Sequence, residues 1–264
     1  MTYADVNGQR LYYEDSGGDG PAVVLSHGFL MDHEMFAPQV TALAPEFRVI
    51  TWDERGFGDT EFDGKPFTYW DSARDCLGLL DHLGIEQAVL GGMSQGGYLS
   101  LRAALLAPER VRALVLIATQ SDLESPEKIP LYQAMFDAWA AEGPSDAMAA
   151  AVAGIIVADP AHDPLARRWI AKWQARPPEL IVEPGRCLLE REDDVSRRLS
   201  EITCPAMVFH GTEDTAIPMA SAERLAAGLP GCDGVVAIQG AGHASNLTHP
   251  GEVNPPLLAF LRGL

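Results

Sequence analysis

Short apolar runs alternate along most of this chain with amphipathic stretches of helical length. Runs without internal polar alternation are typical of strands that are buried on both faces of a sheet. Between them, apolar residues recur at helical spacing, as in the stretch that ends near Leu80. Strands that alternate with helices predict a mostly parallel sheet covered by helices on both faces, which is an α/β fold. The predicted buried strands are residues 22–26, 48–52, 88–90, 113–117, 204–211 and 235–238.

Two local signals fix the ends of predicted elements. Asn7-Gly8 separates the alternating segments 3–6 and 10–14, which predicts a hairpin with a tight two-residue turn. Thr68 is followed three residues later by Asp71, and this spacing predicts a capping box that opens a helix running through Leu80. A further helix is expected to begin at about His33.

The strand-helix rhythm stops between residues 120 and 200. Eight prolines divide this stretch into short helical pieces: Pro126, Pro130, Pro144, Pro160, Pro164, Pro177, Pro178 and Pro184. We therefore predict that residues 120–200 form a helical cap inserted into a core made of residues 1–119 and 201–264. Ligand sites are mostly apolar, and three of the five tryptophans lie in this insertion. Most aromatic residues of the insertion are expected to pack within the cap and one or two to reach a substrate pocket, with Trp139 and Trp169 as the candidates.

The segment Gly92-Met93-Ser94-Gln95-Gly96 has the G-x-S-x-G spacing of a nucleophile elbow. In such an elbow a serine occupies a strained turn between a buried strand and a helix, and glycines are needed because no neighbouring Cβ atoms fit. The context agrees: an apolar run precedes Ser94, and a Leu/Ala-rich helical stretch follows it and ends at Pro108. Ser94 is therefore the predicted nucleophile.

An acid and a base follow the serine in the chain order that this architecture uses. Asp214 comes directly after the late strand 204–211 and is the predicted orienting acid, with Glu213 as its competitor. His243 lies in the glycine-rich loop after strand 235–238 and is the predicted base. His249 is its rival, although it precedes Pro250 in what reads as the start of the last helix.

The sequence also predicts two backbone donors for a developing oxyanion. Strand 22–26 runs into His27-Gly28-Phe29, the place from which the second donor of such a site originates. The predicted donors are the N–H groups of Phe29 and of Gln95, the residue after the nucleophile. We also expect the Phe29 side chain to line the acyl pocket.

Taken together, these motifs resemble the α/β-hydrolase superfamily over the whole chain. The resemblance is nearest to its small cofactor-independent branch of carboxylesterases, 3-oxoadipate enol-lactonase-like enzymes and non-heme haloperoxidase-like perhydrolases. It rests on His27-Gly28, on the segments 53–58, 92–96 and 108–111, on Asp214 with Pro218, and on Gly242-His243. One departure is Thr248, which stands where the family often carries a glutamate.

This resemblance implies an eight-stranded sheet with a helical cap and a Ser94-His243-Asp214 mechanism on esters or lactones of small to medium size. No cofactor and no metal is implied. Perhydrolysis and C–C bond hydrolysis use the same machinery and remain alternatives. A ligand receptor that keeps the hydrolase fold is a further alternative from another class of protein.

Composition narrows the choice of partners. The chain has 264 residues, 47% of them hydrophobic, and a net charge of −18, which disfavours nucleic acid and anionic membranes as partners. The first residues lack the basic and apolar regions of a signal peptide. The four cysteines show no paired spacing, so we expect free thiols and a cytoplasmic location. The expected partner is a small-molecule ester or lactone, and homo-oligomerisation is left open.

Overall fold

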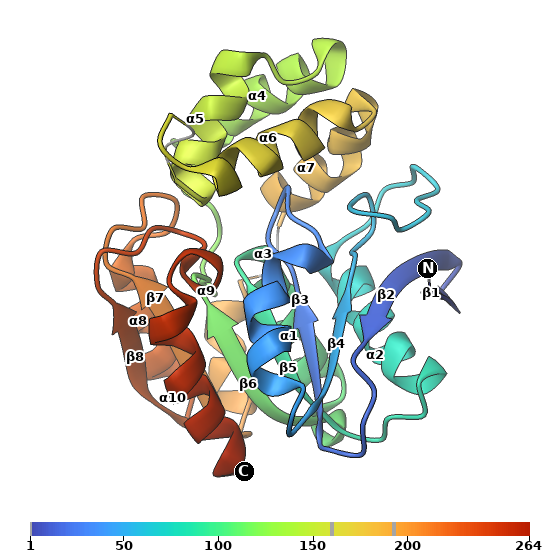
Figure 1. The fold of residues 1–264 in the computed structure, drawn as a ribbon, viewed down its shortest axis with the longest axis vertical. Coiled ribbons are helices and arrows are strands. Elements are labelled where there is room, and N and C mark those ends of the chain that lie inside the picture. Colours follow the sequence, from blue (N-terminus) through green and yellow to red (C-terminus); the bar gives the residue numbers. More distant parts are fainter. Residues whose placement is uncertain (1, 159–160, 192–193) are drawn as a thin grey trace.

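The computed structural model describes residues 2–158, 161–191 and 194–264. Its centre is an eight-stranded sheet with the strand order β1-β2-β4-β3-β5-β6-β7-β8 (Figure 1). Only the first strands break the parallel arrangement, because β1 pairs antiparallel with β2 and β2 pairs antiparallel with β4. The strands are β1 Thr2–Val6, β2 Gln9–Asp15, β3 Ala22–Ser26, β4 Arg48–Trp52, β5 Ala88–Met93, β6 Val111–Ile117, β7 Ala206–Gly211 and β8 Cys232–Ile238.

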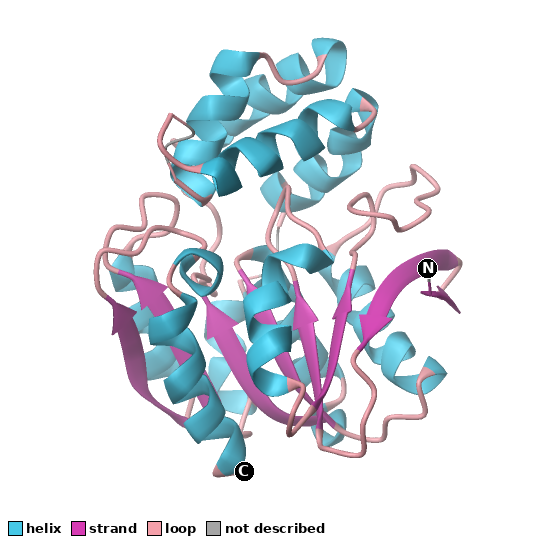
Figure 2. Ribbon diagram, viewed as in Figure 1, coloured by secondary structure: helices cyan, strands magenta, loops and turns pink. Residues whose placement is uncertain are grey.

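Helices cover both faces of this sheet, as Figure 2 shows. Side chains of β3 divide between the two layers: Val23 and Leu25 pack with α1 and α10, whereas Val24 packs with α2, α3 and α8. Both layers are needed because β3 is buried on both sides. The core helices are α1 Ala37–Leu43, α2 Tyr69–His82, α3 Gln95–Leu106, α8 Met219–Gly228, α9 Ser245–Thr248 and α10 Pro250–Arg262, with short 3₁₀ turns η1 His33–Phe36 and η2 Pro108–Arg110.

The local signals in the sequence correspond to observed element ends. Asn7 and Gly8 both have positive φ, 49° and 77°, as a two-residue hairpin turn of this hand requires. Thr68 and Asp71 form the reciprocal capping box that opens α2. The helix expected from about His33 begins instead as the 3₁₀ turn η1, and α1 starts only at Ala37. Pro38 in the first turn of α1 is compatible with that start, because the missing N–H would have no partner there.

Four helices form a cap above the carboxyl ends of the parallel strands (Figure 1). They are α4 Ile129–Glu142, α5 Asp146–Ile156, α6 Pro164–Ala175 and α7 Val182–Leu189, with the 3₁₀ turn η3 Pro178–Ile181. The predicted insertion extends to residue 200, but the turn η4 Val195–Glu201 packs with the core, since Val195 and Leu199 join the layer that contains α3 and α8. The cap therefore ends earlier than the sequence pattern indicated. In the described part of the chain no helix combines the length and the apolar character needed to cross a membrane.

Candidate active site

Ser94 lies on a tight turn between β5 and α3. Its φ of 51° and ψ of −113° are strained for a residue with a side chain. The turn is closed so tightly that a Cβ added to Gly92 would lie 2.1 Å from the carbonyl carbon of Gly96. A Cβ added to Gly96 would lie 2.0 Å from the backbone oxygen of Ser26 on β3. Glycine at these two positions is therefore a steric requirement of the turn that presents Ser94.

Replacing Gly96 with alanine is expected to destabilise the protein by about 3 kcal/mol, the upper end for overpacking, because the clash is with backbone that cannot rotate away. Urea unfolding measures this change. Gly154→Ala in α5 is the matched control, since a Cβ there meets nothing within 4 Å. That control is expected to raise the free energy of unfolding by up to about 1 kcal/mol through helix propensity. Equal effects of the two substitutions would contradict the steric account.

His243 and Asp214 are joined by a hydrogen bond in the loops after β8 and β7. The His243 Nδ1 lies 2.8 Å from Asp214 Oδ2, and the Asp214 side chain is fully buried. The other carboxylate oxygen of Asp214 accepts the N–H groups of Ala216 and Ile217 at 2.8 and 3.0 Å. Burial alone would raise the pKa of Asp214, but the charge and hydrogen bond of His243 and the Ile217 N–H hold it below the ordinary value. Asp214 is thus a fixed carboxylate that orients the imidazole.

The competing acid and base lie elsewhere. Glu213 is exposed, and its backbone N–H donates to the oxygen of Ala241. The Nδ1 of His249 lies 2.9 Å from the hydroxyl oxygen of its neighbour Thr248 at the start of α10. Neither side chain lines the cavity that Ser94 and His243 both line.

Two backbone segments beside Ser94 carry the N–H groups that the sequence predicts as oxyanion donors. Gln95 is the first residue of α3, so its N–H has no acceptor inside the helix. On the other side, Phe29 follows Gly28, whose carbonyl oxygen lies 2.8 Å from His27 Nδ1. The Nε2 of that ring accepts the Glu54 N–H, and burial lowers the pKa of His27. His27 is therefore a buried neutral ring whose two nitrogens are both held by backbone groups.

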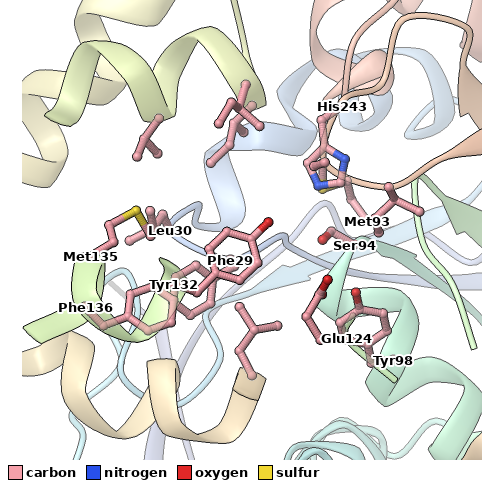
Figure 3. A pocket seen from close by; sticks show the side chains of 16 residues that line it. Phe29, Leu30, Met93, Ser94, Tyr98, Glu124, Tyr132, Met135, Phe136 and His243 are labelled. Atoms are coloured by element: carbon pink, nitrogen blue, oxygen red, sulfur yellow. The ribbon is translucent and has the colours of Figure 1, made fainter. Parts of the chain in front are cut away.

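Ser94 and His243 face one cavity of about 110 Å³ between the sheet and the cap (Figure 3). Apart from these two residues its wall is largely apolar and aromatic, with one carboxylate. The lining residues are Phe29, Leu30, Met93, Ser94, Tyr98, Glu124, Tyr132, Met135, Phe136, Val152, Ile155, Ile156, Leu188, Ala216, Ile217 and His243.

The aromatic residues expected in this cavity fall into two groups. Phe29 lines it and packs against Phe136 at 5.2 Å between ring centroids. Trp139 and Trp169 do not line it, which corrects the expectation for these two residues. Trp139 packs against Trp173 within the cap, and Trp169 lies beside Lys172 at 4.8 Å. Both tryptophans lie where the cap meets loops of the core, and each lines a cavity other than the one that Ser94 lines.

Several lining residues carry only a weak sequence signal. Tyr132, Met135 and Phe136 have the i, i+3, i+4 spacing of one helix face, which identifies a buried face and leaves open what it meets. For Glu124 and Tyr98, no sequence pattern indicates that they line the cavity. Glu124 lies in the loop between β6 and α4, where nothing in the sequence indicates which way a side chain points.

Among the residues that the structure describes, one cluster has the spacing of a metal site: Asp32, His33 and Asp53, whose ligand atoms lie within 4.8 Å of one another. Protein partners already engage each of them. His33 Nδ1 lies 2.9 Å from Asp53 Oδ1, and Asp53 also accepts the N–H groups of His33 and Asp59. Asp32 pairs with Lys172 and caps the turn η1. These contacts give the three residues a structural role: they hold the η1 turn and link it to Lys172 of the cap helix α6.

Comparison with known proteins places this geometry in a family. The family model described as "alpha/beta hydrolase fold" matches residues 21–250. A relative named "Putative carbamate hydrolase RutD" from Caulobacter sp. strain K31 is 31% identical over 96% of this chain and 96% of its own. A "Putative non-heme chloroperoxidase" from Synechocystis sp. is 30% identical over 96% and 95% of the two chains. The chain belongs to the α/β-hydrolase family.

Solved structures agree on the fold and on hydrolysis. An esterase from Thermogutta terrifontis superposes with a TM-score of 0.90 at 29% identity, covering 99% of this chain and 98% of the other. The enol-lactonase from Burkholderia xenovorans gives a TM-score of 0.88 at 30% identity, covering 99% and 100%. The protein is therefore a hydrolase with the α/β-hydrolase fold, and the similar proteins differ in the bond that their names say they cleave.

Proposed function

We propose that this protein hydrolyses carboxylic esters or lactones of small to medium size through an acyl-enzyme on Ser94. One observation carries the proposal. Ser94 lies on a strained turn and lines the same cavity as His243. The Nδ1 of His243 is hydrogen-bonded to the buried carboxylate of Asp214. This arrangement of a nucleophile, a base and an orienting acid is the one that nucleophilic acyl transfer requires.

In the first half of the proposed reaction, Ser94 Oγ attacks the carbonyl carbon of the substrate while His243 Nε2 takes the hydroxyl proton. The carbonyl oxygen becomes an oxyanion, to which the N–H groups of Phe29 and Gln95 donate. The tetrahedral intermediate then expels the alcohol, which receives the proton from His243. Ser94 is left as an acyl ester. In a lactone, the leaving alcohol stays attached to the acyl group.

In the second half, His243 takes a proton from water, and the resulting nucleophile attacks the acyl ester. Collapse of the second intermediate releases the carboxylic acid and returns the proton to Ser94. Asp214 stays ionised throughout, keeps the Nδ1–H tautomer of His243 and stabilises the imidazolium that forms twice. The buried Asp214 with its two backbone donors is suited to this role because it is held in one orientation.

The proposal is tested by mixing the purified protein with p-nitrophenyl butyrate and with a panel of γ-lactones and carbamates. We expect a rapid release of p-nitrophenol, with a burst where deacylation is slower than acylation. Absence of turnover on every ester and lactone would contradict the proposal. Turnover of carbamates alone would move the bond class to that of the RutD relatives.

Chain-length preference follows from the size of the cavity. A cavity of about 110 Å³ beside Ser94 has room for a short acyl chain and too little for the chain of a fat. For p-nitrophenyl esters from acetate to palmitate, we expect kcat/KM to peak at or below octanoate. No jump in activity is expected above the solubility limit of the substrate. A maximum at laurate or beyond would indicate a cap that opens onto lipid.

A further inference from the structure

Glu124 is unusual among the residues that line the cavity, because it brings a carboxylate into an otherwise apolar and aromatic wall. It lies in the loop between β6 and α4, and its side chain is only 11% exposed. No step of the proposed reaction uses it. In Figure 3 its carboxylate points into the space beside Ser94, close to Tyr98.

The contacts of Glu124 fix its position and leave acceptor capacity on the cavity side. Arg191 Nη2 lies 3.5 Å from one carboxylate oxygen, and Lys128 Nζ lies 3.9 Å from the other. The backbone N–H of Ser125 donates to Glu124 Oε1 at 3.2 Å. A carboxylate offers about four acceptor sites, so these three long contacts do not use them all.

Arg191 lies next to Glu124 but does not line the cavity. Its side chain is 4% exposed, and its guanidinium lies 4.0 Å from the centre of the Tyr98 ring. A bound substrate therefore meets the carboxylate of the Glu124–Arg191 pair. An anionic substrate group at this point would face like charge.

Tyr132 supplies a donor in the wall of the same cavity. Its ring is held by stacking on Phe136, at 6.3 Å with an interplanar angle of 18°. Burial, and next the charge of Glu124, raise the pKa of Tyr132 to about 12, so the hydroxyl keeps its proton at neutral pH. Within the described parts of the chain this hydroxyl makes no hydrogen bond, and it lies in the cavity wall.

We propose that Glu124 and Tyr132 form a polar subsite that selects acyl groups carrying an N–H or O–H donor a few atoms from the scissile carbonyl. The inference rests on the proposed function and adds the substrate class. The carboxylate accepts the N–H or O–H of the substrate, and the Tyr132 hydroxyl donates to a neighbouring carbonyl or hydroxyl oxygen. An N-acylamino ester or lactone satisfies both groups, whereas a plain alkyl ester leaves them unpaired and a carboxylate-bearing ester is repelled.

Four p-nitrophenyl esters of similar length distinguish acyl groups that carry an N–H donor from apolar and anionic ones. The acyl groups are N-acetylglycyl, which carries the N–H; N-acetylsarcosyl, in which a methyl group replaces that hydrogen; pentanoyl, which is apolar; and succinyl, which is anionic. Values of kcat/KM, corrected for spontaneous hydrolysis, are compared in the wild type, Glu124→Gln, Tyr132→Phe and Glu127→Gln. Glu127 is the matched control because it is an exposed glutamate of the same loop and does not line the cavity.

In Glu124→Gln the preference for the N-acetylglycyl over the N-acetylsarcosyl ester is expected to fall about fivefold, because a charge-assisted hydrogen bond is roughly twice as strong as a neutral one. The succinyl ester is expected to gain about fivefold relative to pentanoyl in the same variant, because the like charge is gone. Two changes of opposite direction cannot come from a loss of folded protein. Tyr132→Phe is expected to lower the N-acetylglycyl to pentanoyl ratio about threefold, and Glu127→Gln to change none of these ratios.

The subsite is contradicted if Glu124→Gln hydrolyses the pentanoyl ester and leaves both ratios within twofold of wild type. If Glu124→Gln does not fold, an unchanged N-acetylglycyl to pentanoyl ratio in Tyr132→Phe contradicts it instead. If the wild type hydrolyses none of the four esters and none of the γ-lactones of the first panel, the proposed function itself is overturned, which is a different result.

Discussion

Ser94→Ala is expected to lower kcat on p-nitrophenyl butyrate by about a millionfold, because the members of a catalytic triad act as a unit and removal of one loses nearly all of its effect. The fold should persist, since the backbone of residue 94 carries the turn: its N–H donates to Ile117 and its carbonyl accepts from Thr119. His243→Ala should lose nearly as much. Steady-state rates together with thermal unfolding of the same preparations measure both quantities.

The control for this experiment is Ser125→Ala, an exposed serine near the cavity that does not line it. It should keep wild-type activity on the butyrate ester. If Ser94→Ala retained more than a few per cent of the wild-type rate in clean protein, another group would have to be the nucleophile.

Asp214→Asn is expected to lower kcat by about ten-thousandfold. The amide of asparagine can donate to His243 Nδ1, and that contact would place the imidazole proton on the nitrogen that must accept the proton of Ser94. The Ala216 and Ile217 N–H groups can still reach an amide oxygen, so the loop should keep its shape. Rates at saturating p-nitrophenyl butyrate, with the unfolding temperature as a check of folding, measure the effect.

Glu213→Gln is the matched comparison, because it changes the neighbouring acid of the same loop and Glu213 is exposed. This variant should lose little activity. The reverse pattern, with Glu213→Gln inactive and Asp214→Asn active, would transfer the orienting role to Glu213.

The fold and the elbow could be predicted from sequence because they depend on short-range rules. A strand that is buried on both faces is mostly apolar, and β3 and β6 are apolar apart from Ser26 and Arg112. A Cβ at position 96 would lie 2.0 Å from a backbone oxygen, so the turn accepts only glycine there. The glycine in the sequence therefore indicates the tight turn directly. The chain order of serine, acid and histidine then pointed to Asp214 and His243, which the structure joins by a hydrogen bond.

The cavity wall could not be predicted in the same way. Tyr132, Phe136 and Trp139 all lie on α4, and their spacing shows only that the helix has buried faces. Which face meets the serine depends on how the cap docks, and Trp139, which packs against Trp173, lines a different cavity. Glu124 depends on the path of an irregular loop, for which no periodicity exists. The end of the cap was placed too late because η4 is helical in pattern but packs with the core.

The most direct test of the account is covalent labelling of the nucleophile with diethyl p-nitrophenyl phosphate, followed by peptide mass spectrometry. The account predicts one diethylphosphoryl group on Ser94, stoichiometric release of p-nitrophenol and complete loss of esterase activity. It also predicts that labelling slows strongly in Asp214→Asn and does not occur in Ser94→Ala. Inactivation with the adduct on another residue, or full labelling of the Ser94→Ala variant, would contradict the assignment of Ser94 as the nucleophile.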